Sequence, residues 1–308
     1  MSAVLKTCTF TATLNTGAKM PAIGLGTWRS TKDNGYNAVR KAIDAGYRHI
    51  DSAAVCMNEP VIGKAIRDSG IPRDQLFVST KLWSTQHRNP AQAIKHSLDR
   101  MGLDYVDLYM MHWPLAFKTD LLKTKNYLII PTKADKTPDV DTEWSHVNTW
   151  ELMQDLPSQG TAKAIGVANC SIRHLQQILD SPGNKIVPAT NQVEAHPFLP
   201  QNEMLAFCRH KGIVMEAYSP LGSDGAPFVK EPVMREIAKR YHVEPAQLLI
   251  NWGLKRGCVV LPKSVTPERI VSNLQTFELS DEDFTRINDL APERGSKRTH
   301  NPPWFSFE

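Results

Sequence analysis

Short apolar segments alternate with amphipathic helical segments along most of the chain, and this alternation restricts the fold more than any other feature. Segments with the β-branched and aliphatic content of buried strands are 22–27, 48–52, 76–82, 106–112, 162–169, 189–194, 214–220 and 259–264. Segments with helical periodicity are 34–46, 58–69, 90–102, 146–159, 171–179, 201–211, 230–241 and 267–274. Eight strand–helix units predict parallel strands with helical crossovers, closed into a (β/α)₈ TIM barrel of the α/β class.

An open, doubly wound sheet is the alternative arrangement for the same alternation. That fold carries a glycine-rich GxGxxG first turn, whereas the segment 24–29, GLGTWR, has no third glycine. We therefore expect the closed barrel. A hairpin should precede it, with a strand at Thr9–Leu14, a turn at Asn15–Ala18 and a second strand entering Met20.

Composition fits one barrel domain spanning residues 1–308, since α/β barrels commonly reach this length. The 36 basic and 32 acidic residues are dispersed, so nucleic acid is not an expected partner. No apolar run has the length of a membrane span, and the amino terminus lacks a continuous apolar signal region. The five cysteines form no CxxC pair and no Cys/His metal pattern. We expect a cytoplasmic monomer with free thiols and without a metal.

Polar residues end three consecutive predicted strands: Asp51, Lys81 and His112. The carboxyl ends of barrel strands surround one mouth, so these side chains should meet although they are far apart in sequence. Each alone has an ordinary structural explanation, as a helix cap, a solvated charge or a hydrogen-bonded imidazole. Together they provide the groups needed for proton transfer to a carbonyl. An apolar pocket around them is predicted by the neighbouring Trp28, Trp83 and Trp113.

Several short motifs are distributed over both halves of the chain. They are GLGTW (24–28), DSAAVCMNEPVIG (51–63), STKLW (79–83), MHWP (111–114), GVANC (166–170), NQVEAHPFLPQ (191–201), EAYSPLGS (216–223) and LPKSVTPERIVSN (261–273). With them the sequence resembles the aldo-keto reductases along nearly its whole length. The resemblance implies NADPH-dependent reduction of an aldehyde or ketone, such as an aldose, glyceraldehyde or a uronate, to an alcohol.

The resemblance also implies a catalytic tetrad of Asp51, a tyrosine, Lys81 and His112, in which the tyrosine protonates the substrate oxygen. The family pattern places this tyrosine at residue 56, which here is Cys56. A thiol, with an ordinary pKa near 8.5, is acidic enough, but it ends several ångströms short of a phenol hydroxyl. Cys56 is then an apolar filler, an activated thiolate beside Lys81, or the mark of a weakened enzyme. We favour the third interpretation, which applies equally to an engineered variant and to a naturally divergent enzyme.

The cofactor residues follow from the same resemblance. It assigns the nicotinamide to Asn169, Gln192 and Tyr218, the pyrophosphate to Ser219, Leu221 and Ser223, and the adenosine end to Lys263, Ser264, Arg269 and Asn273. It further adds Gly26, Thr27, Trp28 and Asp51 to the NADP(H) site, and Trp28, Trp83, His112 and Trp113 to the substrate site. Two cations and a hydroxyl facing a 2′-phosphate favour NADP over NAD.

Two long segments, 115–144 and the tail after Pro292, exceed ordinary connections and are expected to be functional or disordered. The aromatic residues of the tail favour docking over the barrel mouth. Two other functions remain open. One is a catalytically impaired barrel that keeps NADP(H) as a cofactor-binding or regulatory module. The other is a lyase that forms a Schiff base through Lys81.

Overall fold

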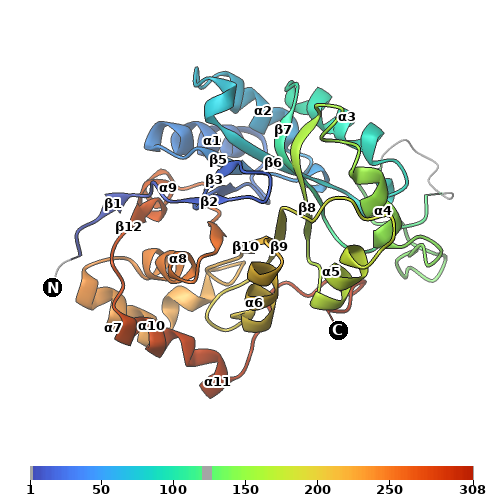
Figure 1. Ribbon diagram of the computed structural model, residues 1–308. Coiled ribbons are helices and arrows are strands. Elements are labelled where there is room, and N and C mark those ends of the chain that lie inside the picture. The colour runs from blue at the N-terminus through green and yellow to red at the C-terminus, as the bar shows by residue number, and fades with distance from the viewer. Residues whose placement is uncertain (1–2, 120–126, 308) are drawn as a thin grey trace.

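The computed structural model describes residues 3–119 and 127–307, and its strands form a closed parallel barrel (Figure 1). The barrel strands follow one another in sequence order: β4 (Leu25–Gly26), β5 (His49–Asp51), β6 (Phe77–Leu82), β7 (Val106–Met111), β8 (Ala162–Ala168), β9 (Thr190–Glu194), β10 (Val214–Tyr218) and β11 (Val259–Leu261). The first and last strands meet through a parallel bridge between Ile23 and Val260. Gly24 N also donates to Val260 O at 3.0 Å. The closed barrel is confirmed, and the open sheet is excluded.

Helices surround the barrel, and each predicted helical segment forms one (Figure 1). They are α1 (Lys32–Ala45), α2 (Glu59–Arg67), α3 (Pro90–Met101), α4 (His146–Met153), α5 (Ile172–Leu179), α6 (Asn202–His210), α7 (Pro232–Tyr241) and α9 (Pro267–Asn273). The prediction for α4 extended too far, to residue 159. Turns replace the helix after Met153, and they include Pro157, whose nitrogen has no hydrogen to donate along a helix.

Further elements lie outside the barrel repeat. The predicted hairpin forms from β2 (Thr11–Thr13) and β3 (Lys19–Pro21). Elements not predicted are the antiparallel pair β1 (Lys6–Thr7) and β12 (Gln275–Thr276), and the helices α8 (Pro245–Lys255), α10 (Asp281–Asn288) and α11 (Leu290–Arg294). Short 3₁₀ helices are η1 (Ala54–Cys56), η2 (Arg73–Gln75), η3 (Ser84–Gln86) and η4 (Pro227–Lys230).

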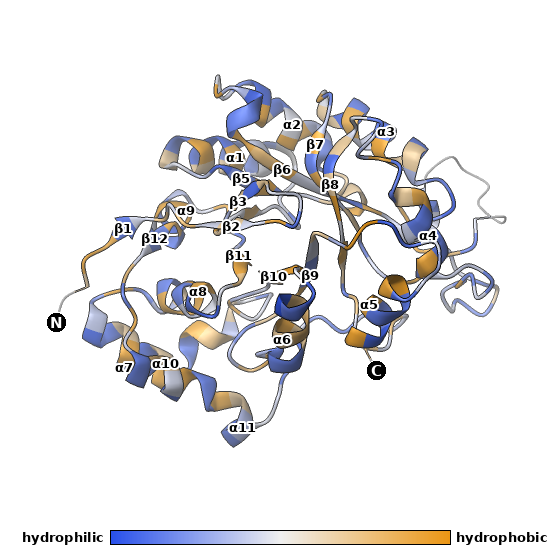
Figure 2. Cartoon of the chain, in the orientation of Figure 1, coloured by the Kyte–Doolittle hydropathy of each residue, from blue (hydrophilic) through white to orange (hydrophobic). Residues whose placement is uncertain are grey.

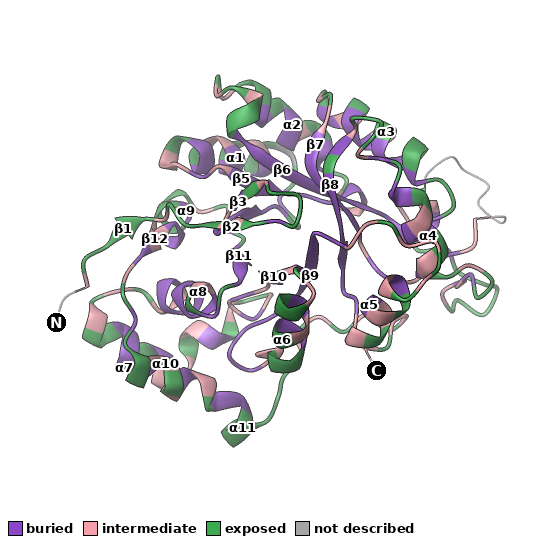
Figure 3. Ribbon diagram, in the orientation of Figure 1, coloured by how far each residue is buried: buried purple, intermediate pink, exposed green. Residues whose placement is uncertain are grey.

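The barrel strands are largely buried, whereas β1 and β2 are mostly exposed, and the helices expose their outer faces (Figure 3). Around each helix, apolar and polar residues alternate as expected for one buried side (Figure 2). The hairpin residues Leu14 and Met20 pack against Phe77, Ala189 and Val259, at the amino ends of their strands. The hairpin thereby covers one end of the barrel, and the carboxyl ends of the strands surround the other.

Candidate active site

A cavity of about 460 Å³ lies at the carboxyl ends of the barrel strands. The predicted site residues that line it are Gly26, Thr27, Trp28, Asp51, Cys56, Lys81, Trp83, His112, Trp113, Asn169, Gln192, Tyr218, Ser219, Leu221, Ser223 and Lys263. The structure therefore brings together residues from every part of the chain, as the strand-end rule predicts. Ser264, Arg269 and Asn273 are not among the lining residues, and they lie beyond Lys263 in the segment from β11 through α9.

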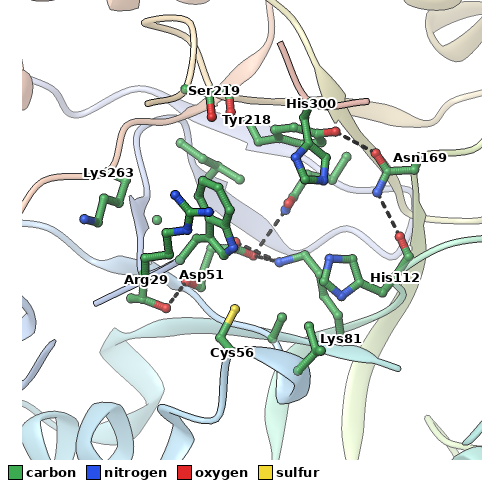
Figure 4. Close-up of a pocket in the computed structure, with 18 of the residues that line it drawn as sticks. Arg29, Asp51, Cys56, Lys81, His112, Asn169, Tyr218, Ser219, Lys263 and His300 are labelled. Atoms are coloured by element: carbon green, nitrogen blue, oxygen red, sulfur yellow. Dashed lines mark hydrogen bonds and ion pairs between the residues drawn. The ribbon is translucent and has the colours of Figure 1, made fainter. Parts of the chain in front are cut away.

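A buried ion pair joins the ends of β5 and β6 (Figure 4). Lys81 Nζ donates to Asp51 Oδ1 at 2.7 Å, to Asp51 Oδ2 at 2.8 Å and to the carbonyl oxygen of Ser52 at 2.8 Å. The carboxylate also accepts a hydrogen bond from Ser79 Oγ at 2.7 Å. An ammonium has three hydrogens, and these contacts use all of them. The geometry disfavours a Schiff-base lyase, which needs a free neutral amine.

His112 follows β7 and forms one wall of the cavity. Its backbone N donates to Leu82 O at 3.1 Å, and its ring lies edge-on to Trp83, with centroids 5.6 Å apart. Desolvation in the pocket, together with the positive charge of Lys81, lowers the pKa of His112 well below its ordinary value. The imidazole is therefore neutral at physiological pH. It can donate a hydrogen bond to a substrate oxygen, but it is not a charged acid.

Cys56 occupies the last position of η1, with its sulfur directed into the pocket (Figure 4). The turn is fixed by a hydrogen bond from Cys56 N to Ala53 O at 3.0 Å and ends at Met57, whose φ is 52°. Burial raises the pKa of Cys56 to about 12, and the nearby charge of Lys81 offsets only part of this rise. This raised pKa is the opposite of what an activated thiolate requires, and it makes the thiol a weaker acid than its ordinary value suggests.

Hydrogen bonds connect the side chains that the resemblance assigns to the nicotinamide. Tyr218 OH donates to Asn169 Oδ1 at 2.8 Å, and Asn169 Nδ2 donates to the carbonyl oxygen of His112 at 2.9 Å (Figure 4). Burial raises the pKa of Tyr218 strongly. This phenol therefore does not replace the missing acid, because its proton is held by Asn169. Gln192 Nε2 donates to Asp51 Oδ1 at 3.1 Å.

Positive charge gathers at the end of the pocket away from His112, where Lys263 and Arg29 lie (Figure 4). Arg29 was not predicted from the sequence. It pairs with Asp224 at 2.5 Å, and this contact bridges the segments that follow β4 and β10. Both partners are well exposed, so the pair adds little stability. Partial burial lowers the pKa of Lys263, because the charged ammonium loses contact with water. An anion beside it would stabilise the charged form.

The carboxyl-terminal tail covers the mouth of the barrel. Its residues His300, Pro302 and Trp304 line the cavity, and the rings of Trp304 and Trp113 are 4.8 Å apart at their centroids. The prediction that the tail docks over the mouth is confirmed. The long loop 115–144 also contributes, since Ile130 lines the cavity, although its residues 120–126 lie outside the described part of the chain.

A buried carboxylate at the end of β9 holds this tail in place. Glu194 Oε1 accepts from Thr299 N at 2.6 Å and Thr299 Oγ1 at 2.7 Å, and Oε2 accepts from His300 N at 2.9 Å. Burial opposes ionisation of Glu194, but hydrogen bonds from His196, Thr299 and His300 outweigh it and lower its pKa. The sequence predicted that the tail docks over the mouth but did not identify Glu194, Thr299 or His300, since only the three-dimensional fold relates them.

Comparison with known proteins agrees with this geometry. The model of the aldo/keto reductase family matches residues 22–292. The chain belongs to the aldo/keto reductase family. It is 55% identical over 308 residues to aldehyde reductase YPR1 of Saccharomyces cerevisiae, covering 100% of this chain and 99% of the relative. It is also 54% identical over 309 residues to glycerol 2-dehydrogenase (NADP(+)) of the same yeast, with the same coverage.

A solved structure supports the fold. The aldose reductase from Schistosoma japonicum superimposes with a TM-score of 0.86 at 34% identity, covering 94% of each chain. Within residues 3–119 and 127–307, no cluster of three or more His, Cys, Asp or Glu side chains is placed to hold a metal ion. None of the helices in those ranges has the length and apolar character needed to cross a membrane.

Proposed function

We propose that this family member reduces small aldehydes and ketones to alcohols with NADPH, at a rate limited by Cys56. The observation that carries the proposal is one cavity with two chemically distinct ends. One end holds the Asp51–Lys81 pair and His112, and the other holds Lys263. This is the polarity required to seat a dinucleotide along the cavity with its reactive ring next to the acid–base groups. The names of the yeast relatives, an aldehyde reductase and an NADP(+)-dependent dehydrogenase, support the same reaction.

The residues present fit NADP(H). Asn273 is buried, and its Oδ1 has no hydrogen-bond partner among the described residues, so it is an acceptor suited to an adenine amino group. Lys263 and Arg269, with the hydroxyl of Ser264, supply cations and a donor for a 2′-phosphate. Backbone and hydroxyl groups of Ser219, Leu221 and Ser223 suit the pyrophosphate. The preference for NADP over NAD is part of the proposal.

The chemistry divides between the cofactor and the protein. The reduced nicotinamide, when bound, supplies the hydride. His112 donates a hydrogen bond to the carbonyl oxygen and stabilises the negative charge that forms there. That oxygen must then gain a proton. All three hydrogens of the Lys81 ammonium are already hydrogen-bonded to Asp51 and Ser52, and Cys56 is a weak acid, with a pKa of about 12. Protonation is therefore the slow step.

The enclosed aromatic pocket indicates small substrates. Trp28, Trp83 and Trp113 line it, and Trp304 closes over it. The dispersed charge of the sequence gives no support for nucleic acid or membranes as partners. We propose that the chain acts as one domain, as a monomer, and in the cytoplasm.

Fluorescence titration with NADPH and loss of NADPH absorbance in the presence of glyceraldehyde, an aldose and a uronate test the proposal. We expect binding and slow turnover. Absence of NADPH binding would contradict the whole proposal. Binding without turnover on any carbonyl would instead favour the second candidate, a catalytically impaired barrel that acts as an NADP(H)-binding or regulatory module. The specific observation in favour of that candidate is Cys56 itself.

A further inference from the structure

A second carboxyl group lies beneath the Asp51–Lys81 pair, in the barrel interior. Glu216 is in the middle of β10 and is fully buried, with a relative exposure of 0%. Its strand neighbour in register is Gln192 on β9, and Gln192 Nε2 donates to Glu216 Oε2 at 3.1 Å. Glu216 does not line the cavity. It therefore does not touch a bound cofactor or substrate.

Gln192 is held by two carboxyl groups at once. The same Nε2 that donates to Glu216 also donates to Asp51 Oδ1 at 3.1 Å. An amide nitrogen has two hydrogens, and these two oxygens are its shortest acceptors, since the sulfur of Met110 is further away at 4.0 Å. The reverse orientation would place the amide oxygen against the carboxylate of Asp51, which has no hydrogen to donate, and this is unfavourable. The chemistry of the neighbours therefore fixes which way the amide points.

The other end of this amide is the end available to a ligand. Gln192 lines the cavity, and among the residues that the structure describes none donates a hydrogen bond to its Oε1. The side chain therefore offers the cavity an acceptor and not a donor. A carboxamide bound there meets Gln192 through its N–H group.

We propose that Glu216 is a positioning residue that fixes the Gln192 amide, so that Oε1 accepts a hydrogen bond from the nicotinamide carboxamide and sets which face of the ring meets the substrate. This inference rests on the proposed function, because it concerns the same cofactor. Glu216 acts only through Gln192.

The electrostatic cost of Glu216 argues against a purely structural role. Lys81 is hydrogen-bonded to Asp51 and not to Glu216, so it acts on Glu216 only through space, within the same desolvated region. Burial and the charge of Asp51 raise the pKa of Glu216 to about 7, against a smaller opposing effect of Lys81. An apolar residue would fill this position at lower cost. A costly buried carboxyl group beside a reaction site is more readily explained by the acceptor it provides.

The test compares NADP⁺ with its 3-acetylpyridine analogue, which replaces the carboxamide N–H₂ by a methyl group. Dissociation constants are measured by quenching of protein fluorescence. The unaltered protein should bind NADP⁺ about fivefold to tenfold more tightly than the analogue, which lies within the range for one hydrogen bond. In Glu216→Leu, which keeps the bulk and removes the acceptor, the ratio should fall below about twofold. Glu216→Gln keeps an acceptor oxygen and should retain most of the discrimination.

Asp283→Asn is the matched control, since Asp283 is a buried carboxylate that binds Arg240 and Tyr241 far from the pocket. In this variant the ratio of the dissociation constants for the analogue and NADP⁺ should equal that of the unaltered protein. A folded Glu216→Leu that keeps the full ratio overturns the inference. If the unaltered protein does not bind NADP⁺ at all, the proposed function fails instead, so the two failures are distinct.

A measurement on the unaltered protein does not depend on a variant that folds. Both Nε2 protons of Gln192 are hydrogen-bonded to buried acceptors, so in nuclear magnetic resonance they should exchange slowly with solvent. Slow exchange of both protons supports the inference. Exchange of either proton at the rate of an exposed amide overturns it.

Discussion

Replacing Cys56 by tyrosine should raise turnover with NADPH and a short aldehyde by about 10²–10⁴-fold, the usual contribution of a positioned general acid. At 1.36 kcal/mol for each factor of ten, this corresponds to about 2.7–5.4 kcal/mol of transition-state stabilisation. The remaining groups are in place, because Asp51, Lys81 and His112 line the same cavity as residue 56.

Two properties of the thiol support this expectation. Burial raises its pKa to about 12, and its sulfur ends several ångströms short of a phenol oxygen. A tyrosine ring would extend from η1 into the cavity of about 460 Å³ and bring a hydroxyl toward Lys81. That hydroxyl would compete with Ser52 O for one hydrogen of the ammonium, a contact that favours the ionised phenol and so makes it a better acid.

Single-turnover rates of NADPH oxidation with glyceraldehyde measure the effect without interference from product release. Cys56→Phe is the matched control, since it adds the ring without the hydroxyl and should remain as slow as the parent. The dissociation constant for NADPH should change little in either variant. If Cys56→Tyr folds, binds NADPH and is no faster than Cys56→Phe on a panel of aldehydes, the missing-acid explanation is refuted.

Four further outcomes are expected. NADP⁺ should raise the thermal midpoint more than equimolar NAD⁺, and Arg269→Glu should remove most of the difference, as measured by scanning fluorimetry. The pKa of Glu216 is about 7 in the folded protein and about 4.5 in the unfolded chain. As the pH rises between these values, the free energy of unfolding therefore falls, by up to about 3 kcal/mol. Glu216→Gln lacks this loss, and its stability in urea relative to the parent should therefore increase from pH 5 to pH 8; a constant difference would contradict the raised pKa. Thr299→Val, which removes a hydroxyl that donates to Glu194, should loosen the tail and raise the KM for aldehyde several-fold with little change in NADPH affinity. Iodoacetamide should label Cys56 negligibly at pH 7, with a rate that grows about tenfold per pH unit toward pH 10, and rapid labelling at pH 7 would show an activated thiolate.

The fold was largely predictable because barrel strands have a local signature. Each is a short apolar segment between helical segments. The choice of a closed barrel over an open sheet then rested on the absence of a glycine-rich first turn. The helix α8 was missed although its start carries a signal, a reciprocal capping pair between Glu244 and Gln247 with Pro245 at the first position. The pair β1 and β12 joins residues from the two halves of the chain, and no local pattern relates them.

Site residues could be predicted from the sequence only where they lie at the ends of barrel strands. Asp51, Lys81 and His112 follow from chain order and from the geometry of a barrel. Glu216 lies inside a strand, and what it binds depends on the register between β9 and β10. The raised pKa of Cys56 could not be predicted for a related reason. A reference pKa belongs to a solvated thiol, and only the three-dimensional structure shows the burial that changes it.

The three hydrogen bonds of Lys81 have an evolutionary consequence. Because Asp51 and Ser52 take every hydrogen of the ammonium, the buried ion pair does not depend on residue 56. The residue at this position can therefore be exchanged while the ion pair keeps its contacts. Cysteine and tyrosine codons differ by a single base, so one base change at codon 56 would place there the tyrosine that the family pattern predicts.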